Sequence, residues 1–473
     1  MKIKWNLICC SLCLFVVFNS LQLNAQTMVQ AWNECGNIEK QIKKTSFPQR
    51  TFSIRDFGAK QGSEKDLCHE AINQAILACN QAGGGRVLVP SGTFYTGPIT
   101  MKSNVNLYLE EGACLKFSTE KYLYTPTVLT RWEGLDCYNL RPLIYAYGET
   151  NLAITGKGTI DGQGSNETWW FMCGNSDRFG WKEGMIAAKN GGRDKLGMYA
   201  ETFTPVDKRQ MTLEDGLRPQ LINFYHCNTV LIEDVTLRNS PFWVIHPLFC
   251  ESLIVRGVKI YSHGPNSDGC DPESSKNVLI ENCLFDTGDD CIAIKSGRNM
   301  DGRKWNVPSE NVIVRNCEMK DGHGGVVVGS EISGGYRNLF VENCRMDSPN
   351  LDRVIRIKTN SCRGGVIENI FVRNVEVGEC KEAILKINLQ YENREKCDRS
   401  FPPVVRNVFM DRITSGKSDY GVLIVGYDDR TNIENIHVTN SKFEQVSKSP
   451  VSVKGAKNVN FKNLFINGQL VTK

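Results

Sequence analysis

After residue 25, the sequence lacks any apolar run close to the ~20 residues that a membrane-spanning helix requires. It also has no low-complexity tract, and its 41% hydrophobic and 23% charged residues are ordinary for a soluble folded protein. Both absences favour a soluble chain from residue 26 onward and argue against a membrane partner.

The sequence has little net charge. The formal charge of +4 falls to +2 when Lys2 and Lys4 are removed together with the N-terminal segment 1–25. This excess of basic residues is too small to indicate nucleic-acid binding. It still permits an anionic polymer to bind at a local basic patch.

Metal-binding cysteine pairs are also missing. Of 19 cysteines, three lie in segment 1–25, and the remaining sixteen form no C-x-x-C pair, which argues against a structural zinc site. We expect no metal and no cofactor. Cys283, Cys317 and Cys344 share one position of a repeat, which favours an internal ladder of small apolar side chains over disulfides.

The N-terminal segment 1–25 has the features of a cleaved signal peptide. Lys2 and Lys4 precede an apolar run over residues 7–18 that is broken only by Ser11, and residues 23–25 resemble a signal-peptidase site. The run is too short to span a bilayer, so we predict a secreted or periplasmic protein. Residues 26–50 are interpreted as an irregular leader.

From residue 51 onward, one phrase recurs along the chain. It begins with asparagine, continues with Val, Ile or Phe, and several copies end in Asn-Cys. Its opening asparagines are at positions 277, 311, 338, 369, 407, 435 and 458. A period in the range of these intervals indicates a solenoid. A leucine-rich repeat has a similar period, but here β-branched and aromatic residues alternate with Gly-, Asn- and Asp-rich joins. We therefore predict an all-β fold, a right-handed parallel β-helix forming a single catalytic domain over residues 51–473.

Two segments depart from the repeat. Residues 66–82 have a helical period, followed by three glycines, and predict a helix that caps the first coil of the solenoid. Residues 164–217 are polar, glycine-rich and irregular, with three tryptophans. Long loops of this kind either wall a cleft or cover a flank of the protein, and both alternatives remain open here.

Four polar clusters interrupt the repeat at spacings close to its period. Asp268 and Asp289 are 21 positions apart, and His323 lies 33 positions from both Asp290 and Arg356. Stacked coils bring residues one period apart into contact, so these side chains should form one patch. A bend at Gly288 should turn both adjacent acids outward, and their mutual repulsion should raise at least one pKa. A proton-holding acid beside ionised carboxylates is what glycosidic cleavage requires.

The two cations of the patch, Arg356 and Lys358, alternate with Ile357 and should both project outward from one strand. Such a pair suits a carboxylate on the substrate. His323 lies between Gly322 and Gly324, and we expect the glycines to leave room for a ligand to approach.

These clusters, Asn266-Ser267-Asp268, Gly288-Asp289-Asp290, Gly322-His323-Gly324 and Arg356-Ile357-Lys358, resemble in order the four motifs of glycoside hydrolase family 28, the pectin-cleaving polygalacturonases. The resemblance covers residues 50–465 and implies inverting hydrolysis of α-1,4-galacturonosidic bonds in an anionic plant polysaccharide by a protein that we expect to be a monomer. By position, Asp289 resembles the general acid, Asp268 and Asp290 the pair that activates water, and His323 a supporting histidine. The substrate-binding residues that it implies are Asn266, Arg356, Lys358 and Tyr391.

An inverting enzyme needs its acid and base about 6.5–9.5 Å apart, and we expect the stacked coils to provide that separation. The long segment at residues 165–217 favours exo action slightly, while endo action stays open. Alternatives are a rhamnogalacturonan or xylogalacturonan hydrolase of the same family, a pectate lyase, and a non-catalytic β-helix that only binds polysaccharide.

Overall fold

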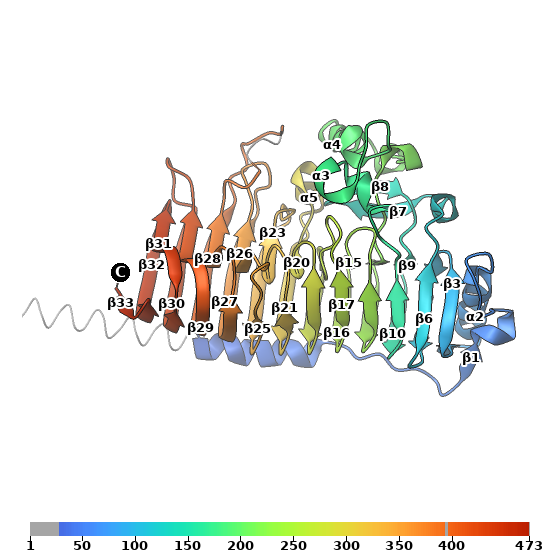
Figure 1. Cartoon of the computed structure of the whole chain (residues 1–473). Helices are drawn as coiled ribbons and strands as arrows, with labels where there is room; N and C mark the ends of the chain where they lie inside the picture. The colour runs from blue at the N-terminus through green and yellow to red at the C-terminus, as the bar shows by residue number, and fades with distance from the viewer. Residues whose placement is uncertain (1–27, 393–395, 473) are drawn as a thin grey trace, which may run out of the picture.

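The computed structural model describes residues 28–392 and 396–472, which form a right-handed parallel β-helix (Figure 1). Its strands form three parallel stacks along one axis, and successive turns of the chain add strands to them. The predicted fold class is confirmed. The predicted signal peptide, residues 1–25, lies outside the described residues.

The first stack consists of β1 (Thr51–Ser53), β2 (Gly85–Val89), β5 (Val105–Leu109), β10 (Thr150–Gly156), β13 (Asn228–Glu233), β16 (Glu251–Arg256), β18 (Lys276–Glu281), β21 (Ser309–Arg315), β24 (Tyr336–Glu342), β27 (Val366–Glu379), β29 (Val404–Val425), β30 (Ile433–Phe443) and β32 (Ala456–Ile466). The second consists of β3 (Gly92–Thr96), β6 (Ala113–Phe117), β11 (Thr159–Asp161), β14 (Thr236–Arg238), β17 (Lys259–Ser262), β19 (Leu284–Thr287), β22 (Glu318–Met319) and β25 (Arg345–Met346). The third consists of β4 (Ile99–Thr100), β9 (Ile144–Tyr147), β12 (Ile222–Tyr225), β15 (Ile245–Leu248), β20 (Ile292–Ile294), β23 (Val326–Gly329), β26 (Arg353–Lys358), β28 (Ala383–Asn388) and β31 (Val446–Lys454).

The repeated asparagines explain how the coils stay in register. All seven adopt left-handed backbone conformations, with φ from 52° to 65°, which asparagine tolerates better than most residues. After the first, the side-chain amide of each donates a hydrogen bond to the amide oxygen of the one before it, over 2.9–3.4 Å. The repeat therefore marks one bend, stacked coil after coil.

Interior positions carry the apolar half of the repeat. Cys283, Cys317 and Cys344 are free thiols that are each only 2% exposed, so the predicted internal ladder is confirmed for these three. Another pair, Cys362 and Cys397, forms a disulfide. The predicted capping helix is also confirmed: α2 (His69–Gln81) buries Ile72, Ala75 and Ile76 and covers the first coil.

The prediction of an irregular leader over residues 26–50 is wrong for residues 28–41, which form a helix along the outer face of the first stack (Figure 1). Outward-facing apolar side chains of successive strands meet it, among them Ile313, Phe340 and Phe371. Glu39 on this helix accepts two hydrogen bonds from Arg315, at 2.6 and 2.9 Å. The apolar outer face of the first stack, unusual for a solvent-facing surface, explains why a helix is required there.

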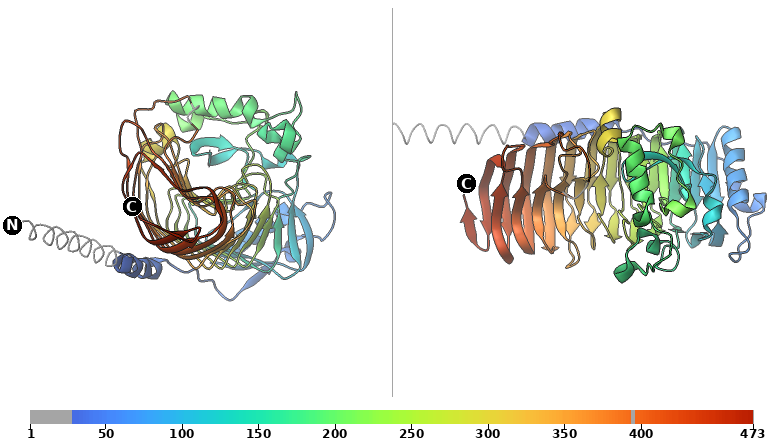
Figure 2. Two further views of the ribbon diagram at one scale, coloured as in Figure 1. Left: turned by 60° about the vertical axis from the view of Figure 1, so that its left-hand side comes forward. Right: turned by 90° about the horizontal axis from the view of Figure 1, so that it is seen from above.

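On another side of the solenoid lies an insertion that the repeat does not predict (Figure 2). It combines the antiparallel hairpin of β7 (Val128–Trp132) and β8 (Leu135–Asn139) with short helices: η3 (Trp170–Cys173), α3 (Ser176–Phe179), η4 (Ala188–Asn190), α4 (Gly192–Glu201), η5 (Val206–Lys208) and η6 (Leu213–Asp215). The segment expected to be irregular is therefore partly helical. Other elements outside the stacks are η1 (Ile54–Phe57), η2 (Lys121–Tyr124), α5 (Asn299–Trp305) and β33 (Gln469–Val471).

A buried charge network anchors the β7–β8 hairpin to the coils. Fully buried Arg131 donates to Asp136, on the same hairpin, at 2.7 Å, and to Glu273, in the body of the solenoid, at 2.9 Å. The other carboxylate oxygen of Glu273 lies 2.8 Å from Nε2 of His246. This network fixes where the hairpin tip lies relative to the coils.

Candidate active site

Coil stacking brings the three predicted carboxylates together. One side-chain oxygen from each of Asp268, Asp289 and Asp290 lies within 4.8 Å of the other two. Asp268 follows β17, and the two adjacent acids lie at the bend between β19 and β20 in the next coil, where the Gly269 N–H donates to the Asp290 carbonyl at 2.9 Å. The predicted bend and patch are both present. The distance between these oxygens is shorter than the about 6.5–9.5 Å expected between the carboxyl groups of an inverting acid and base, and that expectation for the whole groups stays a prediction.

Asp289 is the most accessible of the three acids, and it is paired with His323. Its Oδ1 lies 3.0 Å from Nδ1 of the histidine, and the side chains of Asp289 and His323 are 18% and 41% exposed. This hydrogen bond, with the charge of Asp289, raises the pKa of His323 above its ordinary value. Burial would raise the pKa of Asp289, but the His323 contact and nearby lysines outweigh burial and lower it.

The glycines beside His323 also serve packing, and that they leave room for a ligand stays a prediction. A Cβ on Gly322 would lie 2.9 Å from the Asp289 carbonyl oxygen, and one on Gly324 would lie 3.2 Å from Oδ1 of Asp290. Side chains at these positions would push the histidine coil away from the acid coil. The glycines therefore set the distance between His323 and Asp289.

Asp290 lies deeper and is held by the two predicted cations. Lys358 Nζ is 2.7 Å from its Oδ2 and Arg356 Nη1 is 3.3 Å from its Oδ1. Both cations project outward from their strand as predicted, with Ile357 in the core, and the pocket covers them so that Arg356 and Lys358 are only 7% and 6% exposed. Both still face the ring of Tyr391, at 5.3 Å from its centre. A substrate carboxylate would thus compete with the carboxylate of Asp290 for contacts with Arg356 and Lys358.

Asp268 has partners that the sequence did not reveal. Lys295 Nζ lies 3.6 Å from Asp268, 3.6 Å from Asp271 and 3.1 Å from Glu331. Burial, with the charges of Asp289 and Asp290, raises the pKa of Asp268 to about 8 against the opposing charge of Lys295. Burial likewise raises the pKa of Asp271. Side chains alternate between the two faces of a strand, and this alternation puts Lys295 on the same face as Asp289. It was the one feature of the sequence that indicated a place for Lys295 in the site.

The acids open into a polar pocket of about 200 Å³. All eight predicted site residues lie in it or directly beneath it. Asn266 lines it while its amide oxygen accepts a hydrogen bond from Arg218 at 2.8 Å. The wall includes residues outside the repeat: Glu133 of the hairpin tip, Arg193 of α4, and Glu392 after β28. Trp169, in contrast, is fully buried. The 165–217 segment therefore both walls a pocket and covers a flank.

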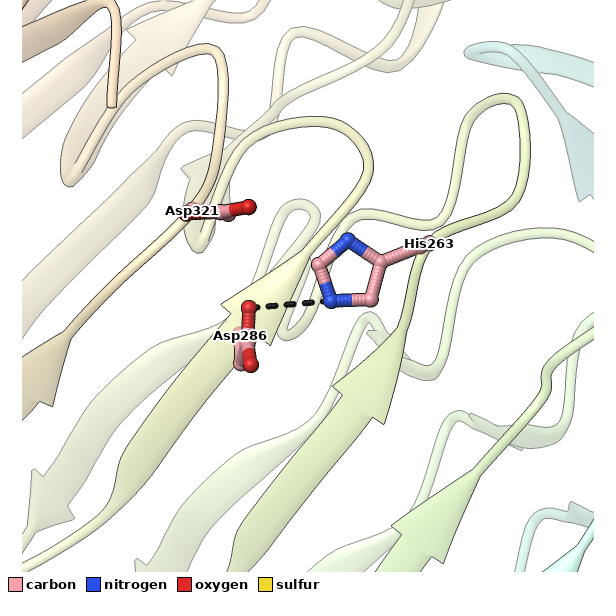
Figure 3. A group of neighbouring side chains, drawn as sticks. All are labelled: His263, Asp286 and Asp321. Carbon is pink, nitrogen blue, oxygen red and sulfur yellow. Dashed lines mark ion pairs between the residues drawn. The ribbon is translucent and has the colours of Figure 1, made fainter. Parts of the chain in front are cut away.

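A second polar hollow adjoins His323 on its other side, and its wall includes His263 and Asp321. Figure 3 shows these two residues with Asp286, whose Oδ1 lies 2.9 Å from His263 Nε2. The carboxylate of Asp321 accepts hydrogen bonds from Ser348 and Asn350, at 2.5 and 3.1 Å. These contacts explain why His263, Asp286 and Asp321 lie close together. They form a hydrogen-bonded rim outside the pocket of the three acids.

Comparison with known proteins agrees with this geometry. The family model described as glycosyl hydrolases family 28 matches residues 207–463. The chain is 30% identical over 342 residues to a probable polygalacturonase of Vitis vinifera, covering 70% of this chain but only 61% of that protein. It is 27% identical to an exo-poly-alpha-D-galacturonosidase of Dickeya chrysanthemi, covering 89% of this chain and 71% of the relative.

Among solved structures, the chain is similar to a hyperthermoactive exopolygalacturonase from Thermotoga maritima. The TM-score is 0.88 and the identity 40%, covering 93% of this chain and 96% of the other. Within the part of the chain that the structure describes, no helix is long and apolar enough to cross a membrane. With the four motifs meeting at one pocket of a β-helix and the family model matching more than half of the residues, the chain belongs to glycosyl hydrolases family 28.

Proposed function

We propose that this protein hydrolyses α-1,4-galacturonosidic bonds of polygalacturonate from a chain end. The observation that carries the proposal is one pocket in which Asp268, Asp289 and Asp290 lie beside a pair of cations and under a wall contributed by the insertion. The similar proteins from Dickeya and Thermotoga, named as exo-acting enzymes, support the same activity. Arg356 and Lys358 suit a galacturonate unit in the pocket, because a uronate carboxylate needs cationic partners.

In this proposal Asp289 protonates the leaving oxygen, as the only one of the three acids with substantial access to the pocket. Without substrate, the His323 contact keeps Asp289 ionised, and the cluster holds its proton on Asp268. An incoming substrate carboxylate adds negative charge, which raises the pKa of nearby acids and loads Asp289 with a proton. The coupled acids share this proton, and substrate binding moves it from Asp268 to Asp289, the acid that protonates the leaving oxygen.

The same arrangement favours an attacking water over a covalent intermediate. Asp290 is fully buried and gripped by two cations, which leaves it poorly placed to attack a sugar carbon. Asp268 is also buried, and Lys295 lies 3.6 Å from its carboxylate, which leaves it poorly placed for the same attack. Asp290, together with Asp268 once its proton has moved to Asp289, instead orients and deprotonates a water, so the α-linked substrate yields a β-configured product.

Exo action follows from the size of the pocket. A hollow of about 200 Å³ is smaller than the sites that typically hold drug-sized ligands, and it suits a single sugar unit. The insertion and Glu392 would block a chain that had to run past both sides. The proposal includes export of the protein to the periplasm or the cell exterior, because a polymer of the size of polygalacturonate is degraded outside the cytoplasm.

A polygalacturonate digest tests the proposal directly. Early products should be one short sugar of constant size, with the remaining polymer shortened slowly, and nuclear magnetic resonance should detect the β-anomer first. Reducing ends should appear in excess chelator, without the ultraviolet absorbance that a lyase product would give. A ladder of mixed oligomers would contradict exo action, and failure to release any reducing ends would contradict hydrolysis.

We expect activity to fall as the pH rises through about 8. Asp268, with its pKa raised to about 8, holds a proton below that pH and loses it above, and the raised pKa of His323 likewise keeps the histidine protonated to a higher pH than usual. A cluster without its proton has none to give to the leaving oxygen. The test is kcat/KM across neutral and alkaline pH, because this ratio reports the pKa values of the free enzyme, with tryptophan fluorescence confirming that the protein stays folded. A kcat/KM that stays constant well above pH 8 would contradict this assignment.

A further inference from the structure

The wall of the pocket carries a cation that lies outside the four motifs. Arg193 lies in the first turn of α4, on the insertion, and lines the same pocket as Asp289. The other cations there, Lys295, Arg356 and Lys358, each contact a carboxylate of the catalytic floor. A sugar unit in the pocket would therefore meet Arg193 as well as these floor cations.

The position of Arg193 is fixed by the tip of the β7–β8 hairpin. Its Nη2 lies 2.8 Å from Oε2 of Glu133, and Arg298 Nη1 approaches the same oxygen at 3.1 Å. Glu133 is buried, with φ of 43°, and the Arg298 N–H donates to the Gly134 carbonyl at 2.9 Å. A Cβ on Gly134 would collide with Arg298 and Glu331, at 2.8 and 2.9 Å, so the tip cannot move inward.

This arrangement leaves Arg193 able to bind an anion. One carboxylate, Glu133, is shared between two guanidinium groups, and the Arg193 side chain is 44% exposed. A guanidinium offers several N–H donors in a planar fork, and the contact with Glu133 uses only part of that fork. A carboxylate is the ligand that such a fork matches best.

We infer that Arg193 binds the carboxylate of the terminal galacturonate unit and so makes the pocket selective for an acidic chain end. This inference rests on the proposed function and names the residue that recognises the end of the substrate. Arg193 acts in binding and touches no reacting bond. It should therefore affect KM more than kcat.

The test compares Arg193→Gln with the wild-type enzyme on three trigalacturonates: one unmodified, one methyl-esterified only at the non-reducing unit, and one only at the reducing unit. On the unmodified substrate, kcat/KM should fall about 10- to 100-fold, the range for a hydrogen bond to a charged group, chiefly through KM. Wild type should discriminate against the ester at one end. Arg193→Gln should lose that discrimination, because the two changes remove the same contact.

Lys195→Gln is the matched control, since Lys195 lies on the same helix and pairs with Asp215 at 2.9 Å, away from the pocket. It should retain near wild-type kinetics. The inference is overturned if Arg193→Gln leaves kcat/KM unchanged, or if it slows esterified and unmodified substrates equally, as a structural defect would. If wild type releases no reducing ends from polygalacturonate, the proposed function itself fails, an outcome distinct from a failure of Arg193 alone.

Discussion

Asp289→Asn is expected to lower kcat on polygalacturonate by about 10²- to 10⁴-fold, the contribution typical of general acid catalysis. The asparagine amide keeps the shape of the side chain but cannot give a proton to the leaving oxygen. Substrate binding should be nearly unchanged, because the proposed carboxylate contacts are made by Arg193, Arg356 and Lys358. Reducing-end release measures kcat, and titration calorimetry with trigalacturonate measures binding.

A second readout separates chemistry from misfolding in this variant. The pKa of His323 is raised mainly by its hydrogen bond to Asp289, so it should move back toward the ordinary histidine value in Asp289→Asn. Asp286→Asn is the control from the same coil, since Asp286 pairs with His263 at 2.9 Å outside the pocket. It should keep kcat within a few-fold of wild type. Retention of more than a tenth of wild-type kcat by folded Asp289→Asn would refute its role as the acid.

Arg131→Met is expected to destabilise the protein by about 3–5 kcal/mol, the usual cost of removing one partner from a buried ion pair. Asp136 and Glu273 would remain buried without the guanidinium that bridges them at 2.7 and 2.9 Å. The hairpin whose tip carries Glu133 would lose its anchor to the coils, so activity should fall as well. Urea unfolding followed by tryptophan fluorescence gives the change in stability.

Two further variants make this expectation specific. Adding Glu273→Gln to Arg131→Met removes one of the stranded charges and should recover part of the lost stability. Arg337→Met removes a half-exposed arginine from its contact with Glu310 and should shift the urea midpoint little. If Arg131→Met and Arg337→Met have the same urea midpoint, the buried network contributes no more to stability than a half-exposed ion pair does.

The sequence was most informative where residue type alone requires a local conformation. Asparagine at positions 277, 311 and 338 and at the later copies of the phrase gave the period of the stacked coils, and each of these residues has a left-handed backbone and an amide hydrogen bond to its neighbour. The spacing of Asp268, Asp289 and Asp290 likewise predicted that they meet. Both inferences depend only on stacking coils of nearly constant length, which the order of residues along the chain encodes.

Contacts between segments that are distant in sequence were not predictable in this way. That Arg356 and Lys358 contact Asp290 depends on how far each side chain reaches across two coils, and pattern alone indicated only that both point outward from their strand. Helix 28–41 gains its stability from a sheet face that includes Ile313, Phe340 and Phe371, on strands that come much later in the chain. Leader sequences of this length have weak helical signals by themselves, because isolated short helices are marginal in water.

The sequence by itself determined that this chain coils into a β-helix and that four polar motifs meet on one of its surfaces, because a repeat fixes which residues become neighbours. Only the tertiary structure decided the depth of each acid, which carboxylate holds the proton, and which segments wall the pocket. Those properties depend on burial, on the charges of Lys295, Lys358 and His323, and on where the insertion packs against the coils. Desolvation and pairwise charge act through distances in space, which a linear pattern does not contain.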